Sequence, residues 1–520
     1  MTSRYLTEEG RQSFAGHSTM EILFNYLGMY QQLERDDSLF QSEQVGGGGP
    51  ASDISPALQR LGLFEISVLV MQGTARFEFA YNKHMRHQDK IRQWMASCER
   101  SLVTLVGELS SIEADRTLTD FPLLSLDYRS LERLKKETLP AAGINTWDEV
   151  EDVYPCSPMQ QGLLLSQNRN ADTYKVQFMF KVEPADPAMP VNPERLATSW
   201  QRVINRHSML RAIFINSVAE GGIFDHVILK EHVAHIRYAH CTDETAVDAL
   251  RKLDPIDVTT SQPQHLFTIC TTHSGAVYCR LDISHALIDA GSVSIILDSL
   301  SQAYESELSL DHGSPYSNYI KYLQGRSLES SMKYWMEHLD GVEPCHFPLA
   351  TGKQTIEGAA NKLSSVKVDL GDASKNLRAF CDASSVTVPN FFQFIWCLIL
   401  QAYTGSSDVS FGYLASGRDV PVPGIGAIVG PLISMMVCRL NIIAGRSVSE
   451  LLQDLQGHYA AGLEHQHCSL AQIHHGLGLS GKPLFNTVLS VQRAPSASQV
   501  ETNKLSFSSV GAHDPTEVSR

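Results

Sequence analysis

One short stretch of the sequence brings together side chains that could do chemistry. Ser284 and His285 stand side by side, and Asp289 follows four residues after the histidine. A neutral imidazole can accept or position a proton near neutral pH. The same spacing also suits a purely structural His–Asp pair, which is the commoner case in a chain with 20 histidines. The stretch therefore indicates a candidate site that needs support from the rest of the chain.

The residues on either side predict the elements that position this stretch. From 277 to 284 apolar residues alternate with polar ones, which is the period of a half-buried strand. From 293 to 304 apolar residues recur at helical spacing. His285 and Asp289 thus lie at a turn from strand to helix, and such turns on a rigid scaffold often carry function.

The composition describes a soluble globular protein. The 520 residues are 43% hydrophobic and 19% charged, which provides for a large core and about three domains of ordinary size. The net charge of -15 argues against nucleic acid as the main ligand, since phosphate backbones bind basic surfaces. The ten cysteines form no Cys-x-x-Cys pair, which favours a reducing compartment over disulfides or a zinc site.

We expect a cytoplasmic protein with no membrane partner. The first residues lack the apolar core of a signal peptide, and the longest apolar stretch, 391–403, is too short to span a bilayer. This stretch is better interpreted as a buried helix. The histidine clusters at 465–467 and 474–475 have no matched set of acidic ligands, so we expect no metal site.

The first 150 residues combine strands, a loop, a helix and a turn-rich segment. Four glycines and a proline at 46–50 predict a flexible loop over 42–54. Between 113 and 150 turns break the apolar pattern, with one short helix at 130–137, so we expect a linker that packs on its neighbours. The remaining patterns predict strands at 21–28, 64–71 and 77–81 and a helix over 91–105.

A second unit opens with Tyr154-Pro155-Cys156-Ser157-Pro158-Met159-Gln160-Gln161-Gly162-Leu163-Leu164. Ser157 and Pro158 make a good helix start, because the hydroxyl caps the first turn and proline suits the first helical position. This string closely resembles the first core motif of condensation domains in nonribosomal peptide synthetases. The stretch around His285 is in register as the third motif. Other stretches resemble the remaining motifs in order: 205–214, 316–319, 334–335, 416–419, 429–439, 483–487 and 514–517.

As a set, these motifs span residues 148–520 and make a specific match. The resemblance implies an α/β (α+β) fold, like that of chloramphenicol acetyltransferase, in which two lobes form a V around an active-site tunnel. We assign the first lobe to 151–340 and the second to 341–520. Family members continue beyond the stretch at 514–517, so we expect a truncated second lobe with an exposed sheet edge.

The resemblance also implies roles for single residues. His285 matches the second histidine of the family's His-His-x-x-x-Asp-Gly motif and would handle the acceptor amine, either as a base or as a positioning group. Asp289 matches the aspartate, which in the family is structural and pairs with an arginine at the position of Arg439. Ser284 stands where the family has its first histidine, and Ala290 where it has glycine.

Other motif positions are expected to support the site or to lie near it. We expect His207 to anchor a helix end, and 417–419 to shape a loop near the lobe interface rather than to bind phosphate. Four positions should line or lie near the tunnel: Ser157, Gln160, Arg211 and Asn486.

The beginning of the chain carries a second resemblance. Residues 24–28, Phe-Asn-Tyr-Leu-Gly, resemble a motif near the end of epimerisation domains of the same synthetases. Residues 79–82 and 91–94 resemble the closing strand and helix of those domains. The resemblance implies that 1–112 is the C-terminal part of an epimerisation domain, a partial copy of the same fold, with no epimerase activity of its own.

Together the resemblances imply amide formation between two carrier-bound thioesters, with a D-configured residue at the end of the donor. The acceptor amine would attack the donor carbonyl and release the carrier thiol. The chain shows no carrier serine motif and no adenylation-type loop. It would therefore bind no cofactor covalently, and its substrates would arrive on the 4'-phosphopantetheine arms of partner carrier domains, next to adenylation domains of the parent synthetase.

Three alternatives stay open at this point. The chain could be a non-catalytic fragment of a synthetase, as the expected truncation at both ends would suit. It could be a terminal cyclising condensation domain, since fungal cyclising domains carry the same Ser-His-x-x-x-Asp. It fits a coenzyme A-dependent acyltransferase less well, because the Asp-Phe-Gly-Trp-Gly-like motif of those enzymes is absent.

Overall fold

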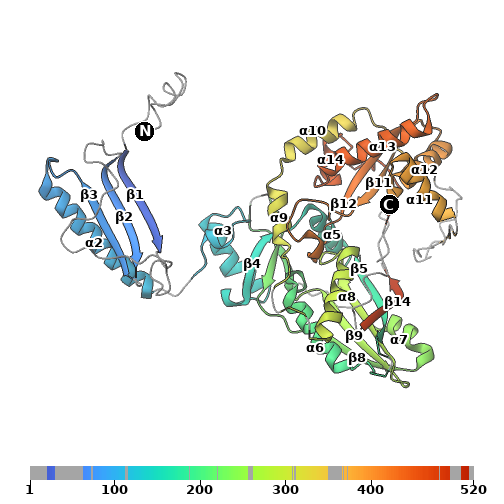
Figure 1. Ribbon diagram of the computed structural model, residues 1–520, viewed down its shortest axis with the longest axis horizontal. Coiled ribbons are helices and arrows are strands. Elements are labelled where there is room, and N and C mark those ends of the chain that lie inside the picture. Colours follow the sequence, from blue (N-terminus) through green and yellow to red (C-terminus); the bar gives the residue numbers. More distant parts are fainter. Residues whose placement is uncertain are drawn as a thin grey trace. The chain divides into compact units, whose positions relative to one another are not determined.

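Two compact units, 1–114 and 115–520, make up the chain in the computed structural model (Figure 1), and each is considered by itself. The predicted loop at 42–54 and the motif at 514–517 lie outside the described residues. The described residues are 20–29, 62–71, 74–111, 115–171, 173–186, 188–219, 221–255, 262–306, 308–309, 312–348, 366, 368–369, 371, 373–479, 481–491 and 505–513.

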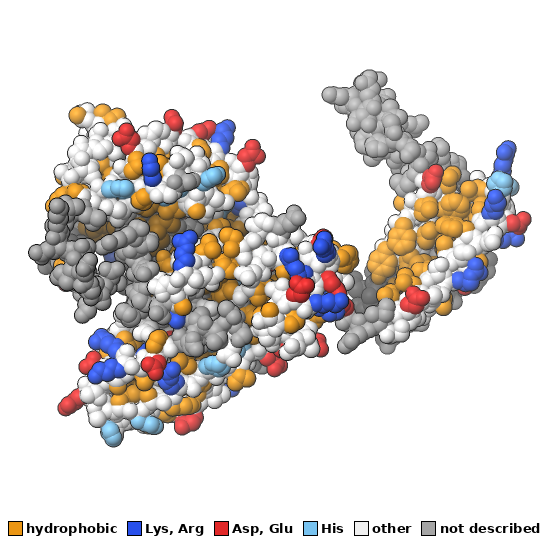
Figure 2. All heavy atoms as spheres, turned by 180° about the vertical axis from the view of Figure 1, so that it is seen from behind, with side chains coloured by type: hydrophobic (Ala, Val, Ile, Leu, Met, Phe, Trp, Pro, Cys, Tyr) orange, Lys and Arg blue, Asp and Glu red, His pale blue; other side chains and the backbone are white. Residues whose placement is uncertain are grey.

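The first unit is a three-stranded sheet with one helix. It consists of β1 (Met20–Met29), β2 (Gly62–Met71), β3 (Thr74–Tyr81) and α2 (Gln88–Ser111). β2 pairs in parallel with β1 and antiparallel with β3. Trp94 of α2 packs on Phe64 and Phe79, with ring centroids 5.1 and 5.9 Å away. Apolar side chains of β1 stay exposed, and Figure 2 shows a broad hydrophobic area on this unit.

A five-stranded sheet lies at the centre of the first lobe of the second unit. Its order is β14–β5–β10–β9–β8. The central strand β10 pairs antiparallel with both neighbours and spans the residues that the alternation predicted. The bounds are β5 (Lys175–Pro184), β8 (Ile236–Cys241), β9 (His265–Thr272), β10 (Val277–Ser284) and β14 (Leu505–His513).

The prediction that this central strand is half-buried is wrong, because helices cover both faces of the sheet. Nearly every side chain of β10 is buried, including the ion pair of Arg280 and Asp282 at 2.5 Å. Arg280 also donates to the carbonyl of Leu253 at 3.0 Å, just beyond the end of α7. The helices of this lobe are α5 (Pro158–Arg169), α6 (Pro193–Arg206), α7 (Ala246–Lys252), α8 (Ala290–Tyr304) and α9 (Ser317–Gln324).

The segment at 115–150, expected as a linker, packs into the second unit. Its apolar side chains share a core with a three-stranded sheet of order β4–β7–β6. Instead of one helix at 130–137, the chain forms α3, a π-helical turn at 134–138 and α4. The bounds are α3 (Tyr128–Arg133), α4 (Leu139–Ala141), β4 (Val150–Pro155), β6 (Ala212–Asn216) and β7 (Phe224–Leu229).

The second lobe surrounds a sheet of order β12–β11–β13. Its longest helix, α12, contains the predicted buried helix at 391–403 and places Phe394, Cys397 and Leu400 in the core. The helices are α10 (Leu328–His338), α11 (Ala373–Ser384), α12 (Val388–Thr404), α13 (Val448–Leu463) and α14 (Leu470–Gly476). The strands are β11 (Asp408–Ala415), β12 (Ser434–Asn441) and β13 (Val488–Leu489).

Within the described parts of the chain, no single helix has the length and apolar character needed to cross a membrane. Among the residues that the structure describes, one bent pair, 376–384 and 388–404, meets those two criteria jointly, with 98° between its helices.

Two segments from the second lobe reach into the first lobe. Residues 416–433, here called the crossover loop, join β11 to β12 and place Val420, Ile428 and Leu432 in the core around the five-stranded sheet. β14 adds a strand to the edge of that sheet by pairing with β5 (Figure 1). The lobes therefore exchange segments and do not divide at residue 340 alone.

Buried histidines predict that the protein loses stability in mild acid. Burial lowers the pKa of His265 and of His226 to about 3, and that of His207 to about 4, from 6.5. Their neutral rings thus contribute stability above pH 6.5 that is lost as the pH falls, because the unfolded chain takes up protons first. Between about pH 6.5 and 5 we expect each ring to lower the free energy of unfolding by up to about 1.4 kcal/mol per pH unit.

Urea denaturation at a series of pH values measures this slope. His265→Gln should make the slope shallower, because it removes one titrating ring. An unfolding free energy that is equal at neutral pH and in mild acid would contradict the prediction.

Candidate active site

His285 lies directly after β10, in the turn that leads to α8. Its backbone amide donates to the carbonyl of Tyr174 at 2.8 Å, and its ring is half-buried. The ring Nδ1 is buried and has no hydrogen-bond partner among the described residues. A triad histidine, by contrast, has a carboxylate bound to this nitrogen. The imidazole is therefore held through its backbone and neighbours rather than by an acidic side chain.

Asp289 acts as the N-cap of α8 instead of orienting the histidine. Its Oδ1 accepts hydrogen bonds from the backbone N and from the Oγ of Ser292, both at 2.7 Å. The side chain is only 1% exposed. A carboxylate at this place satisfies free amides of the first helical turn and complements the helix dipole. This arrangement starts α8 at Ala290, five residues after His285.

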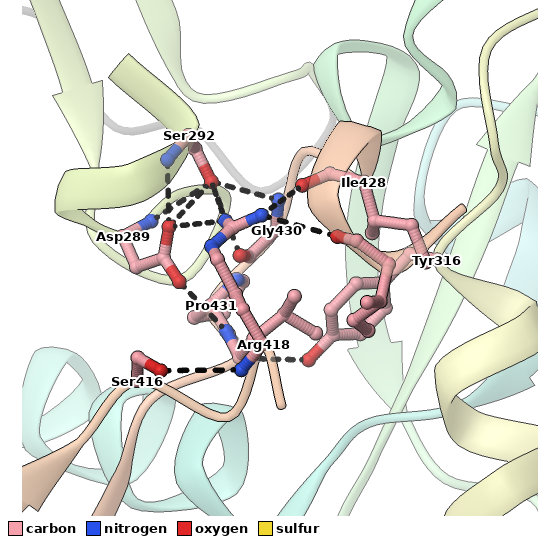
Figure 3. Close-up of polar contacts among 10 residues, drawn as sticks. Asp289, Ser292, Tyr316, Ser416, Arg418, Ile428, Gly430 and Pro431 are labelled. Carbon is pink, nitrogen blue, oxygen red and sulfur yellow. Dashed lines mark hydrogen bonds and ion pairs between the residues drawn. The ribbon is translucent and has the colours of Figure 1, made fainter. Parts of the chain in front are cut away.

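Arg418 of the crossover loop supplies the charge that balances Asp289 (Figure 3). Its Nη2 lies 2.7 Å from Asp289 Oδ1, while its Nη1 donates to the carbonyls of Ile425 and Ile428. The second carboxylate oxygen, Oδ2, accepts from the backbone N of Leu432 at 3.1 Å. A buried carboxylate is costly without such partners. Asp289 therefore joins the start of α8 to two parts of the crossover loop.

The expectation that Arg439 pairs with Asp289 is wrong. Arg439 lies on β12, and its Nε and Nη2 bind Asp408 of the neighbouring β11 at 3.0 and 2.8 Å. Its Nη1 donates to the carbonyls of His338 and Asp340. The hydrogen bonds to Asp408 raise the pKa of Arg439. Arg418 and Arg439 both stand in stretches that resemble family motifs, 416–419 and 429–439, and only the fold decides which one reaches Asp289.

Two glycines make room for the ion pair. A Cβ on Gly291 would lie 2.5 Å from Arg418 Nε. Gly417 has a φ of +64°, and a Cβ there would lie 1.9 Å from the carbonyl oxygen of Leu432. Ala290, at the family's glycine position, is the exposed first residue of α8. The requirement for glycine therefore falls on residue 291 rather than on residue 290.

The start of α5 lies against the same turn. Ser157 caps α5 by accepting from the backbone N of Gln160 at 3.3 Å. The Nε2 of Gln160 donates to the carbonyl of Ala286, the residue after His285, at 2.8 Å. The hydroxyl of Tyr316 lies 3.1 Å from Ser157 Oγ. It also donates to the carbonyl of Pro431 at 2.9 Å (Figure 3). The structure thus brings Ser157 and Gln160 together with the His285 turn, and Tyr316 links them to the crossover loop.

Arg211 and Asn486 have other surroundings. Arg211 is buried and binds Glu151 at 2.5 Å and the carbonyl of Lys230 at 3.3 Å. Asn486 bonds to both the backbone N and the carbonyl of Phe347, at 2.7 and 2.9 Å. None of the hydrogen bonds in the described part of the chain joins either side chain to the His285 turn.

Gln167 is a neighbour of the site that the sequence analysis missed. Its Nε2 donates to the Oγ of the fully buried Ser284 at 2.9 Å. It also lines a cleft of about 790 Å³ that reaches Gln264, whose carbonyl accepts from Ser284 N at 3.0 Å. The available signal was its position seven residues after Gln160, which places both amides on one face of α5.

The histidine clusters have local partners. His465 Nδ1 and His467 Nε2 lie 3.1 and 3.0 Å from the Oγ of Ser331. Over the described ranges, no group of three or more His, Cys, Asp or Glu side chains is arranged to hold a metal ion.

The ion pair of Asp289 and Arg418 predicts a specific loss of stability when it is broken. Arg418→Ala would leave the buried carboxylate of Asp289 without a charge partner, so we expect the free energy of unfolding of the second unit to fall by roughly 3 kcal/mol. Arg418→Lys should lose less, because it keeps a point charge. Urea denaturation followed by circular dichroism measures both values.

Arg446→Ala is the matched control. It breaks a more exposed ion pair with Asp454, so the expected change is below about 1 kcal/mol. A wild-type urea midpoint for Arg418→Ala would show that its ion pair with Asp289 does not hold the lobes together.

Comparisons with known proteins identify the family of this chain. Residues 150–519 match the family model of the condensation domain. The chain is 41% identical to Nonribosomal peptide synthetase 4 of Gibberella zeae and 37% identical to Nonribosomal peptide synthetase 1 of Aspergillus fumigatus. Each alignment covers 99% of this chain but only 7% and 8% of those proteins, so the chain spans less than a tenth of their length.

A solved structure supports the expected fold. The X-domain from teicoplanin biosynthesis aligns with a TM-score of 0.56 at 16% identity, over 69% of this chain and 83% of that one. This likeness and the family match confirm the predicted two-lobed α/β architecture. The chain belongs to the condensation domain family.

Proposed function

We propose that this chain is a condensation segment of a fungal nonribosomal peptide synthetase and joins two carrier-bound substrates through an amide bond. The observation that carries the proposal is the His285 turn, in which a half-buried imidazole with no carboxylate on its buried Nδ1 follows a buried strand. The alignment of almost the whole chain with synthetases from fungi supports the biological setting.

The reaction would place its demands on the imidazole. The acceptor amine attacks the carbonyl of the donor thioester, the C–S bond breaks, and a carrier thiol leaves. The amine must be aimed at the carbonyl and must lose a proton. A neutral imidazole without a bound carboxylate can orient the amine and accept its proton. Asp289 is occupied by Ser292, Arg418 and Leu432, so its role in this scheme is support.

The substrates would arrive from other parts of the synthetase. We propose that two carrier domains present them on 4'-phosphopantetheine arms and that adenylation domains of the same synthetase load those arms. We also propose a cytoplasmic location, with which the free thiols of all ten cysteines agree.

The first unit suggests the configuration of the donor. We propose that 1–112 is the C-terminal part of an epimerisation domain and that the donor therefore ends in a D-residue. Two observations support this proposal: the predicted strands and helix are present, and the alignments with the synthetases extend over this unit.

His285→Ala tests the proposed reaction. We expect the rate of amide formation to fall by about 10²- to 10⁴-fold, the usual contribution of a positioned acid–base group. The assay mixes the chain with a donor carrier protein and an acceptor carrier protein, both loaded as aminoacyl thioesters, and detects the dipeptidyl carrier by mass spectrometry. His273→Ala, at an exposed position between β9 and β10, should keep the wild-type rate.

The outcomes separate the alternatives. An unchanged rate in His285→Ala would contradict the proposed mechanism. A wild-type chain that makes no amide with any loaded pair would favour a non-catalytic segment, and release of a cyclic product would favour a terminal cyclising domain.

Donor stereochemistry tests the assignment of the first unit. In the same assay we expect the D-aminoacyl donor to react at least roughly tenfold faster than its L-enantiomer, since a shaped pocket discriminates by the fit of the transition state. An equal rate, or a preference for the L-donor, would contradict the proposal that an epimerisation step precedes this one.

A further inference from the structure

We propose that Gln167 is a positioning residue for this reaction, which acts through Ser284 and the backbone of His285. The inference rests on the proposed role of His285. Gln167 does not contact the imidazole through any of its described hydrogen bonds; it holds the residues on either side of the turn.

Two glutamines on one face of α5 donate hydrogen bonds to the turn. Gln160 and Gln167 are two helical turns apart. Gln160 donates to the carbonyl of Ala286 at 2.8 Å, and Gln167 donates to the Oγ of Ser284 at 2.9 Å. The two hydrogen bonds thus hold the residue before His285 and the residue after it.

Gln167 also holds the partner of the His285 backbone. Tyr174, whose carbonyl accepts from His285 N at 2.8 Å, has a φ of 56°, in the left-handed region that bulky residues avoid. Gln167 Nε2 lies 3.2 Å from the carbonyl of Thr173 and 3.5 Å from that of Tyr174. A backbone in this conformation persists only where its surroundings hold it. Gln167 is the side chain that bridges it to Ser284.

The imidazole depends on this arrangement because no carboxylate orients its ring. Its Nδ1 has no hydrogen-bond partner in the described structure, and Asp289 is committed to α8 and Arg418. The backbone of 284–286 therefore sets the direction of the ring together with the side chains that half-bury it. Ser284 Oγ also accepts from Ala286 N at 3.2 Å, so its hydroxyl links Gln167 to both ends of the turn.

The nature of both side chains suits this task. Ser284 is fully buried, and its small hydroxyl fits next to an amide donor. Gln167 is neutral, so it provides this donor at a nearly buried place without the cost of a buried charge. Gln167 also lines the cleft of about 790 Å³, so it is not merely a member of a closed core.

Gln167→Met tests the inference, because methionine has a similar length and volume but no N–H donor. We expect kcat for amide formation to fall about tenfold, the size expected for one lost hydrogen bond, while KM for the loaded acceptor carrier stays within about twofold. Hydrogen exchange of the backbone amide of His285, followed by mass spectrometry on the full chain, should speed up by a similar factor.

Gln161→Met is the matched control on the same helix. Gln161 donates to the carbonyl of Cys156 at 3.1 Å and has no described bond to the turn. This variant should keep the wild-type kcat and the wild-type exchange at His285. If Gln167→Met does not fold, Gln167→Leu serves instead, since leucine also lacks the N–H donor and buries no charge.

A double-mutant cycle separates positioning from general stability. In a Ser284→Ala background the hydroxyl partner is already gone, so Gln167→Met should lower kcat by less than about threefold. A purely structural role would lower kcat by the same factor in both backgrounds, and that result would overturn the inference. Wild-type exchange and kcat in Gln167→Met would overturn it as well.

The failure of the proposed function would look different. His285→Ala could keep the wild-type rate of amide formation while Gln167→Met still speeds up hydrogen exchange at the His285 backbone amide. In that case the proposed reaction would be wrong and the contact of Gln167 with the turn would stand. If His285→Ala abolished the reaction and Gln167→Met changed neither exchange nor kcat, only the positioning role would fall.

Discussion

The buried ion pair of Asp289 and Arg418 is the interaction on which the site depends. Asp289 belongs to the turn that leaves the central sheet, and Arg418 belongs to a loop that leaves the sheet of the other lobe. Both charged side chains are largely shielded from water, so each would be unstable without the opposite charge of the other. Gly291 and Gly417 are small for the same reason, because side chains there would push the loop away. The pair therefore ties the two lobes together four residues from His285.

This arrangement assigns separate tasks to neighbouring side chains. The carboxylate serves the scaffold: it caps α8 and binds Arg418 and Leu432. The imidazole has no carboxylate on its buried Nδ1. On the opposite side, Gln160 and Gln167 of α5 hold the backbone around the ring without adding charge. The histidine is thus positioned by neutral hydrogen bonds, whereas the charged side chain of Asp289, paired with Arg418, lies four residues further along the chain.

Sequence reasoning succeeded where local rules decide the structure. The alternation over 277–284 marked β10 residue by residue, and Ser157 with Pro158 marked the start of α5. It failed where a distant element decides. The strand is buried on both faces because helices from other parts of the chain cover it. Residues 115–150 pack on their neighbours as expected, but the sequence did not show that they join the core of the β4–β7–β6 sheet, because β6 and β7 supply the apolar face from elsewhere in the chain.

The sequence by itself determined the family, the candidate histidine and the elements that bracket it, because motif order and short-range periodicity are properties of the chain. Only the tertiary structure decided the partners. The resemblance pointed to Arg439 as the partner of Asp289, but the crossover loop brings Arg418 to this carboxylate, while Arg439 of β12 pairs with Asp408. The sequence did not indicate Gln167 for the same reason. Its partner Ser284 is 117 residues away, and only the folded structure brings the two side chains within hydrogen-bond distance.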